Sequence, residues 1–339
     1  MQNERRRTVL SALISEYVAS SQPVGSKVLV ERYRLGCSPA TVRNELAALE
    51  EDGLVYQPHT SAGRVPTDVG YRAFVDDVVE RHTDTLPAGD VDAIHARYER
   101  VEHELTEVMR ETATVLSALT DCAAVVAAPT LQRARIRRVS LVGLGPTRAT
   151  LVVVTDSGQV ANRSVEFDQP VDGDALAEVE RYVDGALCDL MGTEVTLLRD
   201  RIEGVPGAEA GATLAILDEV IDCLVEADED RVLTHGVTAL LRQPEFTDAD
   251  ALRPVVALLE DSIMVLHVLS DVMQSRDVVV RIGAENRLDG LARMSFVAHH
   301  YGSGDAGGIV GVLGPTRMDY PRAMATVRTV ASTLSEHLG

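Results

Sequence analysis

Residues 38–67, SPATVRNELAALEEDGLVYQPHTSAGRVPT, decide the fold of the N-terminal part of the chain. Ser38 followed by Pro39 is an N-cap and first-turn pair that starts helices, and Gly53 is the residue type that often ends them. Between these signals, apolar residues recur at the spacing of one helix face. These residues are Val42, Leu46 and Leu49. The pattern predicts a helix that ends at Gly53.

Short strands and further helices are predicted on both sides of this helix. Residues 54–56 and Val65 have strand character and bracket a polar, turn-rich loop at 57–64. Upstream, the apolar residues of 5–20 follow the period of a helix with a buried stripe, and Ser26 can cap a second, short helix. Three helices followed by a hairpin are typical of a winged helix-turn-helix domain.

The predicted third helix leaves a polar face near its N-terminus, and this face is the predicted DNA-reading surface. Arg can hydrogen-bond twice to guanine, Asn twice to adenine, and Thr can contact the methyl group of thymine. A solvated helix face is the alternative interpretation, but inside a helix-turn-helix with a basic wing we favour recognition. The wing and the start of the second helix add donors that suit phosphate oxygens or the minor groove. The predicted DNA-binding residues are Ser26, Lys27, Ser38, Thr41, Arg43, Asn44, His59, Thr60, Ser61 and Arg64.

Charge is unevenly distributed along the 339 residues. The chain has 32 Lys and Arg against 52 Asp and Glu, a formal net charge of -20. Residues 1–75 hold nine basic and eight acidic residues, so the acidic excess lies in 76–339. This balance argues against a chain that binds polyanions over its whole surface. A segment kept free of the excess is where a nucleic-acid contact could form.

Neither membrane insertion nor a cysteine framework is predicted. The longest stretch without Asp, Glu, Lys or Arg is eleven residues, short of the roughly 18 that a membrane span needs. The basic cluster at 5–7 is not followed by a long apolar signal segment, so we expect a cytoplasmic protein. The four cysteines are far apart and include no C-x-x-C pair, so neither disulfides nor a zinc knuckle are expected.

Beyond residue 90 the sequence alternates between helical and strand patterns. A heptad-like seam over 90–119 makes a coiled coil possible, but one long amphipathic helix packed on its own domain is favoured. Strand patterns lie at 123–128, 139–144, 151–154, 160–165, 278–282, 294–301 and 309–313. Helical patterns lie at 172–191, 213–243, 252–272 and 320–338. This order predicts an α+β domain interrupted by a mainly helical insertion near 194–272.

One motif supplies an enzyme hypothesis. Residues 302–307, GSGDAG, match the dinucleotide-binding pattern G-x-G-x-x-G, which would indicate a nucleotide-dependent enzyme. That motif must open a helix, yet 309–315 has the pattern of a strand, and too few residues follow for a dinucleotide fold. His299 and His300 lack a second ligand pair at metal spacing. We therefore expect no enzyme activity, no cofactor and no metal site.

Several sequence blocks carry a family resemblance. The blocks in the N-terminal part are PVGSK at 23–27, SPATVRNE at 38–45, LEEDG at 49–53 and QPHTSAGRVPT at 57–67. Later blocks are GVTALL at 236–241, PEF at 244–246, IGAEN at 282–286 and GVLGPTRMDY at 311–320. Together they closely resemble the heat-inducible transcription repressor family HrcA. One departure is Gly-Val-Thr-Ala at 236–239, where the family usually has Gly-Thr-Ser-Asn.

The resemblance implies a DNA-binding repressor of chaperone operons that binds an inverted-repeat operator as a homodimer and releases it under heat stress. In this family a chaperonin is thought to keep the repressor active, so a chaperonin is a further implied partner. The implied domains are a winged helix at 1–81, a linker at 82–90, a GAF-like domain at 91–193 and 273–339, and an inserted dimerisation domain at 194–272.

The GAF-like resemblance leaves a second hypothesis, a winged-helix regulator that senses a small molecule. Polar residues that could line its pocket are Arg281, Glu285, Asn286, Arg317 and Tyr320. The competing interpretation, that these side chains hold the C-terminal strands and helix together, is favoured. The residues indicate no particular ligand.

Overall fold

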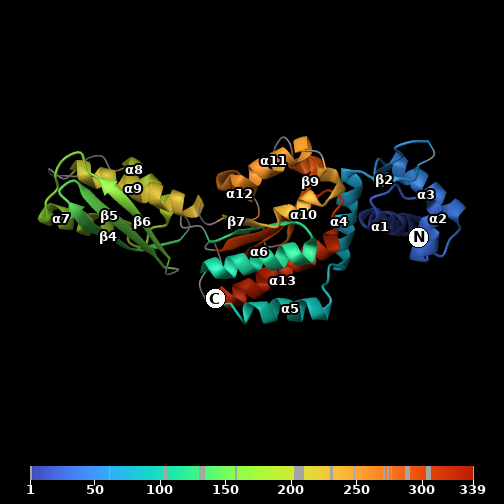
Figure 1. Ribbon diagram of the computed structural model, residues 1–339, viewed down its shortest axis with the longest axis horizontal. Helices are drawn as coiled ribbons and strands as arrows, with labels where there is room; N and C mark the ends of the chain where they lie inside the picture. Colours follow the sequence, from blue (N-terminus) through green and yellow to red (C-terminus); the bar gives the residue numbers. More distant parts are fainter. Residues whose placement is uncertain are drawn as a thin grey trace. The chain divides into compact units, whose positions relative to one another are not determined.

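A computed structural model shows the chain as two compact units. It describes residues 2–60, 62–101, 105–129, 134–156, 159–201, 210–229, 232–247, 249–269, 272, 275, 277–286, 291–302 and 307–338. The first unit comprises Met1–Val126, Thr234–Tyr301 and Ile309–Leu338, and the second consists mainly of Ala127–Leu233. Both combine helices with strands, which confirms the predicted α+β class (Figure 1). The predicted inserted segment, 194–272, contributes residues to both units.

The N-terminal part of the first unit is a group of helices around a small hairpin. Its elements are α1 (Gln2–Ser20), α2 (Ser26–Tyr33), α3 (Pro39–Glu51), β1 (Val55–Tyr56), β2 (Val65–Pro66) and α4 (Asp68–Arg81). The strands pair antiparallel. The buried apolar residues at its centre include Val9, Leu13, Ile14, Leu29, Val42, Leu46 and Leu49. These side chains form a hydrophobic core for this part of the chain. Burial of each one stabilises the fold by roughly 1.5–3 kcal/mol.

The ends of α3 follow the sequence signals, whereas the start of α2 does not. The Ser38 hydroxyl accepts a hydrogen bond from the Thr41 amide at 3.1 Å, as an N-cap does. Gly53 has a φ of +73°, the left-handed conformation that ends a helix at no Cβ cost. In α2 the N-cap is Gly25, with no side-chain cap, and Ser26 is already the first helical residue. The expected cap at Ser26 is therefore wrong.

The single long helix predicted over 90–119 is also wrong. The structure has two helices there, α5 (Ala88–Tyr98) and α6 (Leu105–Thr120), and both pack against α13 (Tyr320–Leu338) (Figure 1). The Tyr98 and Thr112 hydroxyls lie 2.6 Å apart, so α5 and α6 lie side by side. Because the chain folds back, the apolar faces of both helices are buried on their own domain, as the favoured alternative to a coiled coil expects.

A five-stranded sheet lies at the centre of the remainder of the first unit. Its strand order is β7 (Val232–His235), β3 (Ala123–Ala127), β10 (Gly308–Pro315), β9 (Met294–Tyr301) and β8 (Val279–Ile282). Both β3 and β10 are buried along their whole length. The accompanying shorter helices are α10 (Val237–Leu241), η2 (Pro244–Phe246), α11 (Ala249–Glu260) and α12 (Ser262–Leu269). Because β10 is a strand, GSGDAG does not open a helix, and residues 303–306 of that motif lie outside the described residues.

Strand β7 corrects one sequence expectation. It lies inside 213–243, which was expected to be helical throughout. Val232 and Thr234 are β-branched and so compatible with a strand, and β7 pairs with β3 at the edge of the sheet. Tertiary pairing thus overrides the local helical pattern for four residues.

Among the described residues, no helix combines the length and apolar character that a membrane crossing requires.

The second unit is built on an antiparallel three-stranded sheet. Its strands are β4 (Ile136–Gly145), β5 (Arg148–Thr155) and β6 (Val160–Glu166), and its helices are α7 (Gly173–Leu187), α8 (Gly192–Arg201) and α9 (Ala210–Glu229). One face of the sheet is buried in a shared apolar core with these helices. The backbone amides of Val139 and Leu141 on edge strand β4 donate to the carboxylates of Asp184 and Glu180, at 2.8 and 3.3 Å. Helix α7 therefore covers that edge.

Candidate nucleic-acid interface

The N-terminal half of α3 presents the two side chains best suited to read bases. Arg43 and Asn44 are exposed, and neither has a hydrogen bond or ion pair within the part of the chain that the structure describes. The opposite face of α3 is buried, so the helix is held while these two side chains stay free. Ser38 is exposed and Thr41 is half-buried, and their hydroxyls lie 3.0 Å apart.

The loop between β1 and β2 is held in shape by a side-chain amide. Gln57 Nε2 donates to the carbonyl oxygens of Thr60 and Ala62, at 3.0 and 2.8 Å. This arrangement leaves the side chains of His59 and Thr60 exposed. Ser61, another predicted contact, lies outside the described residues. The loop can therefore offer donors to a polyanion without losing its own hydrogen bonds.

The same loop is tied to the segment that precedes α2. Val24 and Arg64 exchange two backbone hydrogen bonds of 2.9 Å. A Cβ at Gly63 would lie 2.4 Å from the carbonyl carbon of Val24, so this close approach requires glycine. The bridge brings the start of α2, with Ser26 and Lys27, near the loop. Lys27 is highly exposed, and its contact with Glu31, at 3.8 Å, is an exposed pair that holds it weakly.

Arg64 differs from the free phosphate donor that the sequence suggests. Its side chain is only 18% exposed, and its Nη2 lies 2.8 Å from Oε2 of Glu50 at the end of α3. The ion pair fastens the loop to α3. Glu50 thus competes with a phosphate for the Arg64 guanidinium. Since Glu50 precedes Arg64 by fourteen positions across a turn and a hairpin, no local pattern shows the pairing.

The basic cluster at the start of α1 is engaged by acidic side chains of the same group of helices. Arg6 donates to Asp52 at 2.8 Å and lies 3.6 Å from Glu45. Arg7 donates to Glu80 at 3.1 Å. These pairs join α1 to α3 and α4. These two arginines therefore serve the packing of the helices, whereas Arg5, the third of the cluster, is exposed and has no partner among the described residues.

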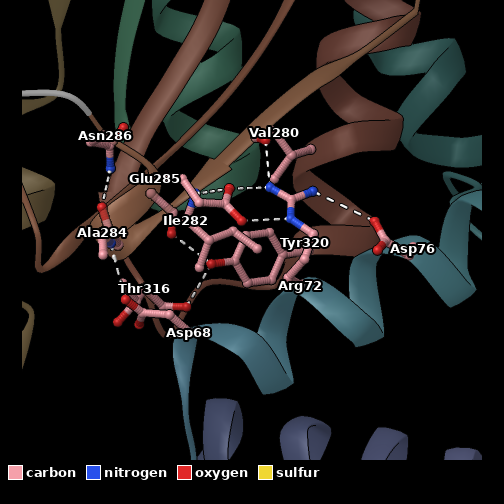
Figure 2. Close-up of polar contacts among 12 residues, drawn as sticks. Asp68, Arg72, Asp76, Val280, Ile282, Ala284, Glu285, Asn286, Thr316 and Tyr320 are labelled. Atoms are coloured by element: carbon pink, nitrogen blue, oxygen red, sulfur yellow. Dashed lines mark hydrogen bonds and ion pairs between the residues drawn. The ribbon is translucent and has the colours of Figure 1, made fainter. Parts of the chain in front are cut away.

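Glu285, one of the residues predicted for a ligand pocket, is paired with α4. Figure 2 shows the Arg72 guanidinium facing this carboxylate: Nε donates to Oε1 at 2.8 Å, and Nη2 makes a second hydrogen bond to Oε2. The same Nη2 donates to the carbonyl of Val280 at 2.7 Å. Burial raises the pKa of Glu285, but hydrogen bonds from Arg72 and from the Ile282 amide outweigh it, so that pKa lies below its usual value.

Arg317, a second predicted pocket residue, is also bonded within the chain. Its side chain is 10% exposed, and Nε donates to Glu245 at 2.7 Å. Nη1 donates to the carbonyl of Val18 at 2.7 Å, and Nη2 to the side chain of Gln243 at 3.0 Å. Val18 belongs to the last turn of α1, where carbonyls lack helical partners. Arg317 thus caps α1 from the other end of the sequence.

The remaining predicted pocket residues brace the C-terminal part of the chain. The Asn286 amide donates to the main-chain carbonyls of Gly283, Leu291 and Met294. The Tyr320 hydroxyl donates to the carbonyl of Thr316 at 2.8 Å, and Arg281 donates to that of Val268 at 3.3 Å. All five side chains therefore make contacts within the chain. The structure adds what the sequence missed, namely that Glu285 and Arg317 reach the N-terminal helices.

Known proteins resemble this chain along its whole length. A family model described as "HrcA protein C terminal domain" matches residues 106–324. The heat-inducible transcription repressor HrcA of Arthrobacter sp. (strain FB24) is 42% identical over 343 residues, which is 100% of both chains. The protein of that name from Streptomyces albus G is 38% identical, over 100% of this chain and 99% of its own.

A solved structure shares the fold. It is described as the crystal structure of a hypothetical protein, and it matches with a TM-score of 0.63 at 23% identity over 98% of both chains. Together with the identities above 30% over full length, this leaves no part of the chain unmatched. The chain belongs to the HrcA family of heat-inducible transcription repressors and is a repressor, not an enzyme.

Proposed function

We propose that residues 1–81 form a winged helix-turn-helix module that binds operator DNA, with α3 in the major groove and the β1–β2 loop on the flanking backbone. The observation that carries the proposal is the exposure of Arg43 and Asn44, without partners among the described residues, on a helix whose other face is buried. A free Arg can donate two hydrogen bonds to a guanine edge, and a free Asn can donate one to adenine N7 and accept one from its N6 amine. The proposed contacts are Ser26, Lys27, Ser38, Thr41, Arg43, Asn44, His59, Thr60, Ser61 and Arg64.

The direct test is fluorescence anisotropy with a duplex that carries an inverted repeat from upstream of the host's own chaperone genes. A scrambled duplex is measured in parallel over a salt series. We expect tighter binding to the repeat, with two chains per duplex, and a salt slope that counts the phosphate contacts. Equal, weak binding to both duplexes would contradict operator recognition by this module.

Arg43→Ala is expected to weaken binding to the repeat by about 1–3 kcal/mol and to relax the preference at one base pair. The reason is that α3 would lose a base-reading donor while its fold is unchanged. Anisotropy with duplexes that differ at single positions measures both effects. Arg81→Ala, at the far end of α4 and paired with Asp77, is the matched control. Wild-type selectivity in the Arg43 variant would remove this residue from the reading surface.

Glu50→Gln is expected to strengthen binding to repeat and scrambled duplexes alike. The substitution removes the ion-pair partner of Arg64 and frees its guanidinium for phosphate. The salt slope of log affinity should become steeper by about one. Glu51→Gln, an exposed neighbour, removes the same charge without releasing Arg64 and is the control. An unchanged slope in the Glu50 variant would show that Arg64 stays a packing residue.

We also propose that the repressor is a homodimer that contacts itself through the second unit. The outer face of the three-stranded sheet carries Ser140, Val142, Thr150, Val152, Val154, Asn162 and Ser164. Its one carboxylate, Glu166, is paired with Arg148 at 2.8 Å. The other charged residue in register on this face is Arg138, which pairs with Glu180 and Asp184 of α7. A two-fold contact brings like surfaces together, so a face without an unpaired carboxylate suits it in a chain of net charge -20. Residues 194–229 of the predicted dimerisation domain belong to the same unit.

Val142→Glu tests this dimer. Val142 is 53% exposed on that face, and a carboxylate there would face its symmetry mate across the contact. We expect light scattering to show a monomer where the wild type shows a dimer. Val79→Glu, on α4 at 46% exposure, is the control and should stay dimeric. A dimeric Val142 variant would place the contact on another surface.

We propose further that the five-stranded sheet with its helices is the GAF-like domain and that heat releases the operator. Support comes from the helices packed on that sheet and from the relatives named heat-inducible repressors. A chaperonin would act by restoring the folded repressor. Anisotropy of the DNA complex during heating, with and without purified chaperonin, measures both steps. Recovery of binding on cooling should increase with chaperonin, and an equal recovery would remove it as a partner.

A further inference from the structure

The contact between α4 and the turn after β8 has no role in the proposed base contacts. We propose that Asp68 and Arg72 are positioning residues. Through residues 283–285 they fix the orientation of the DNA-binding module on the sheet domain, and so set the half-site spacing that the dimer accepts. The inference rests on the proposed function, because half-site spacing matters only to a dimer on an inverted repeat.

The geometry fixes both a position and a direction. Asp68 and Arg72 lie one turn apart on the same face of α4. Asp68 Oδ2 accepts from the Ala284 amide at 3.0 Å, and Arg72 holds Glu285 with two hydrogen bonds (Figure 2). A two-pronged guanidinium–carboxylate pair restrains rotation as well as distance. The third bond of Arg72, to the Val280 carbonyl, extends the contact to strand β8 itself.

The receiving turn is shaped for this contact. Gly283 has a φ of +52°, and a Cβ there would lie 2.0 Å from Oδ2 of Asp68. Only glycine therefore lets the Asp68 carboxylate reach the turn. Glu285 is also held within its own turn, because its Oε2 accepts from the Ile282 amide at 2.9 Å. The turn thus presents the Ala284 amide to Asp68 and the Glu285 carboxylate to Arg72.

A second anchor makes the orientation rigid. Arg317 binds the Val18 carbonyl at the end of α1. The sheet domain therefore contacts two helices of the module, α1 and α4. The rings of Tyr71 on α4 and Tyr320 on α13 also pack against each other, with centroids 5.7 Å apart. Contacts at separate points of two helices prevent the module from pivoting about either one.

The anchors leave the reading surface open. They use α4 and the last turn of α1, whereas Arg43 and Asn44 on α3 remain exposed. A contact that presents the reading face, and does not cover it, suits a positioning role in the DNA-bound state. In a dimer, a module that cannot turn on its own sheet domain accepts fewer half-site separations than a module that can. Loss of the contact should let each module turn and accept other separations.

The test compares Arg72→Ala and Glu285→Ala with the wild type on two duplexes. One carries the inverted repeat from upstream of the host's chaperone genes, and the other has its half-sites moved apart by about 5 base pairs, half a helical turn. We expect each variant to lose about tenfold of the wild-type preference for the native spacing. The variants change net charge in opposite directions, so an electrostatic effect would move their overall affinities apart but not their spacing preference.

Controls separate this role from folding and from the proposed function. Arg81→Ala on the same helix should keep the preference, and Arg72→Ala/Glu285→Ala should lose no more than either single variant. Arg72→Lys keeps the charge without the fork and gives the same readout if an alanine variant does not fold, as circular dichroism will show. Unchanged spacing preference in folded variants, or a wild type that accepts both spacings, overturns the inference. A wild type that does not prefer the repeat to a scrambled duplex overturns the proposed function and the inference with it.

Discussion

Arg317→Ala is expected to lower the free energy of unfolding of the first unit by about 3–5 kcal/mol, the typical cost of removing one partner from a buried ion pair. Arg317 is 10% exposed and bonds to Glu245, Gln243 and the Val18 carbonyl. The variant would leave the Glu245 carboxylate without its cation and the end of α1 without its cap. The Glu245 side chain is only 25% exposed, so water can replace the lost cation only in part.

Urea unfolding followed by tyrosine fluorescence measures this effect. The chain has no tryptophan, and seven of its eight tyrosines lie in the first unit, so the signal reports mainly on that unit. Arg242→Ala is the control, since its pair with Asp121 is exposed and 3.4 Å long and should contribute under about 1 kcal/mol. Arg317→Met/Glu245→Leu should recover much of the loss. Equal costs for the Arg317 and Arg242 variants would show that the buried pair is not a stabilising anchor.

Features that depend on a few neighbouring residues could be predicted from the sequence. The cap at Ser38, the buried stripe of α3 and the left-handed Gly53 act within one or two helical turns, and all three are confirmed. Helix α13 was also predictable, because its apolar pattern is long and regular. The exposure of Arg43 and Asn44 followed from the same period that buried their neighbours.

Features that depend on distant parts of the chain could not be predicted. Arg72 and Glu285 are 213 positions apart, and Arg317 and Val18 are 299 apart, so no spacing rule connects them. Strand β7 has a local pattern compatible with a helix, and the open edge of β3 decides its structure. The break after α5 likewise depends on α13, which offers both helices an apolar surface. In each case tertiary packing selects among local alternatives.

Gly70→Ala is expected to destabilise the N-terminal module by about 3 kcal/mol, at the upper end of overpacking effects. Gly70 lies in the first turn of α4, and a Cβ there would lie 2.0 Å from the carbonyl oxygen of Leu54. That oxygen accepts a hydrogen bond from the Thr67 amide at 3.1 Å, and the Thr67 hydroxyl caps α4. The added methyl group can be accommodated only if α4 moves away from the hairpin, which strains both bonds.

The measurement is thermal unfolding by circular dichroism together with operator affinity at a temperature where the wild type is folded. Gly89→Ala is the matched control: it lies in α5, has no atom within 4 Å of its added Cβ, and should be neutral or stabilise by about 0.5 kcal/mol. Helix α4 packs against the hairpin and also makes the contact with the turn after β8. The Gly70 variant should therefore lose operator affinity as it loses stability. A Gly70 variant as stable as the Gly89 variant would mean that α4 can shift on the hairpin without cost, and α4 could then not hold the reading helix in a fixed orientation.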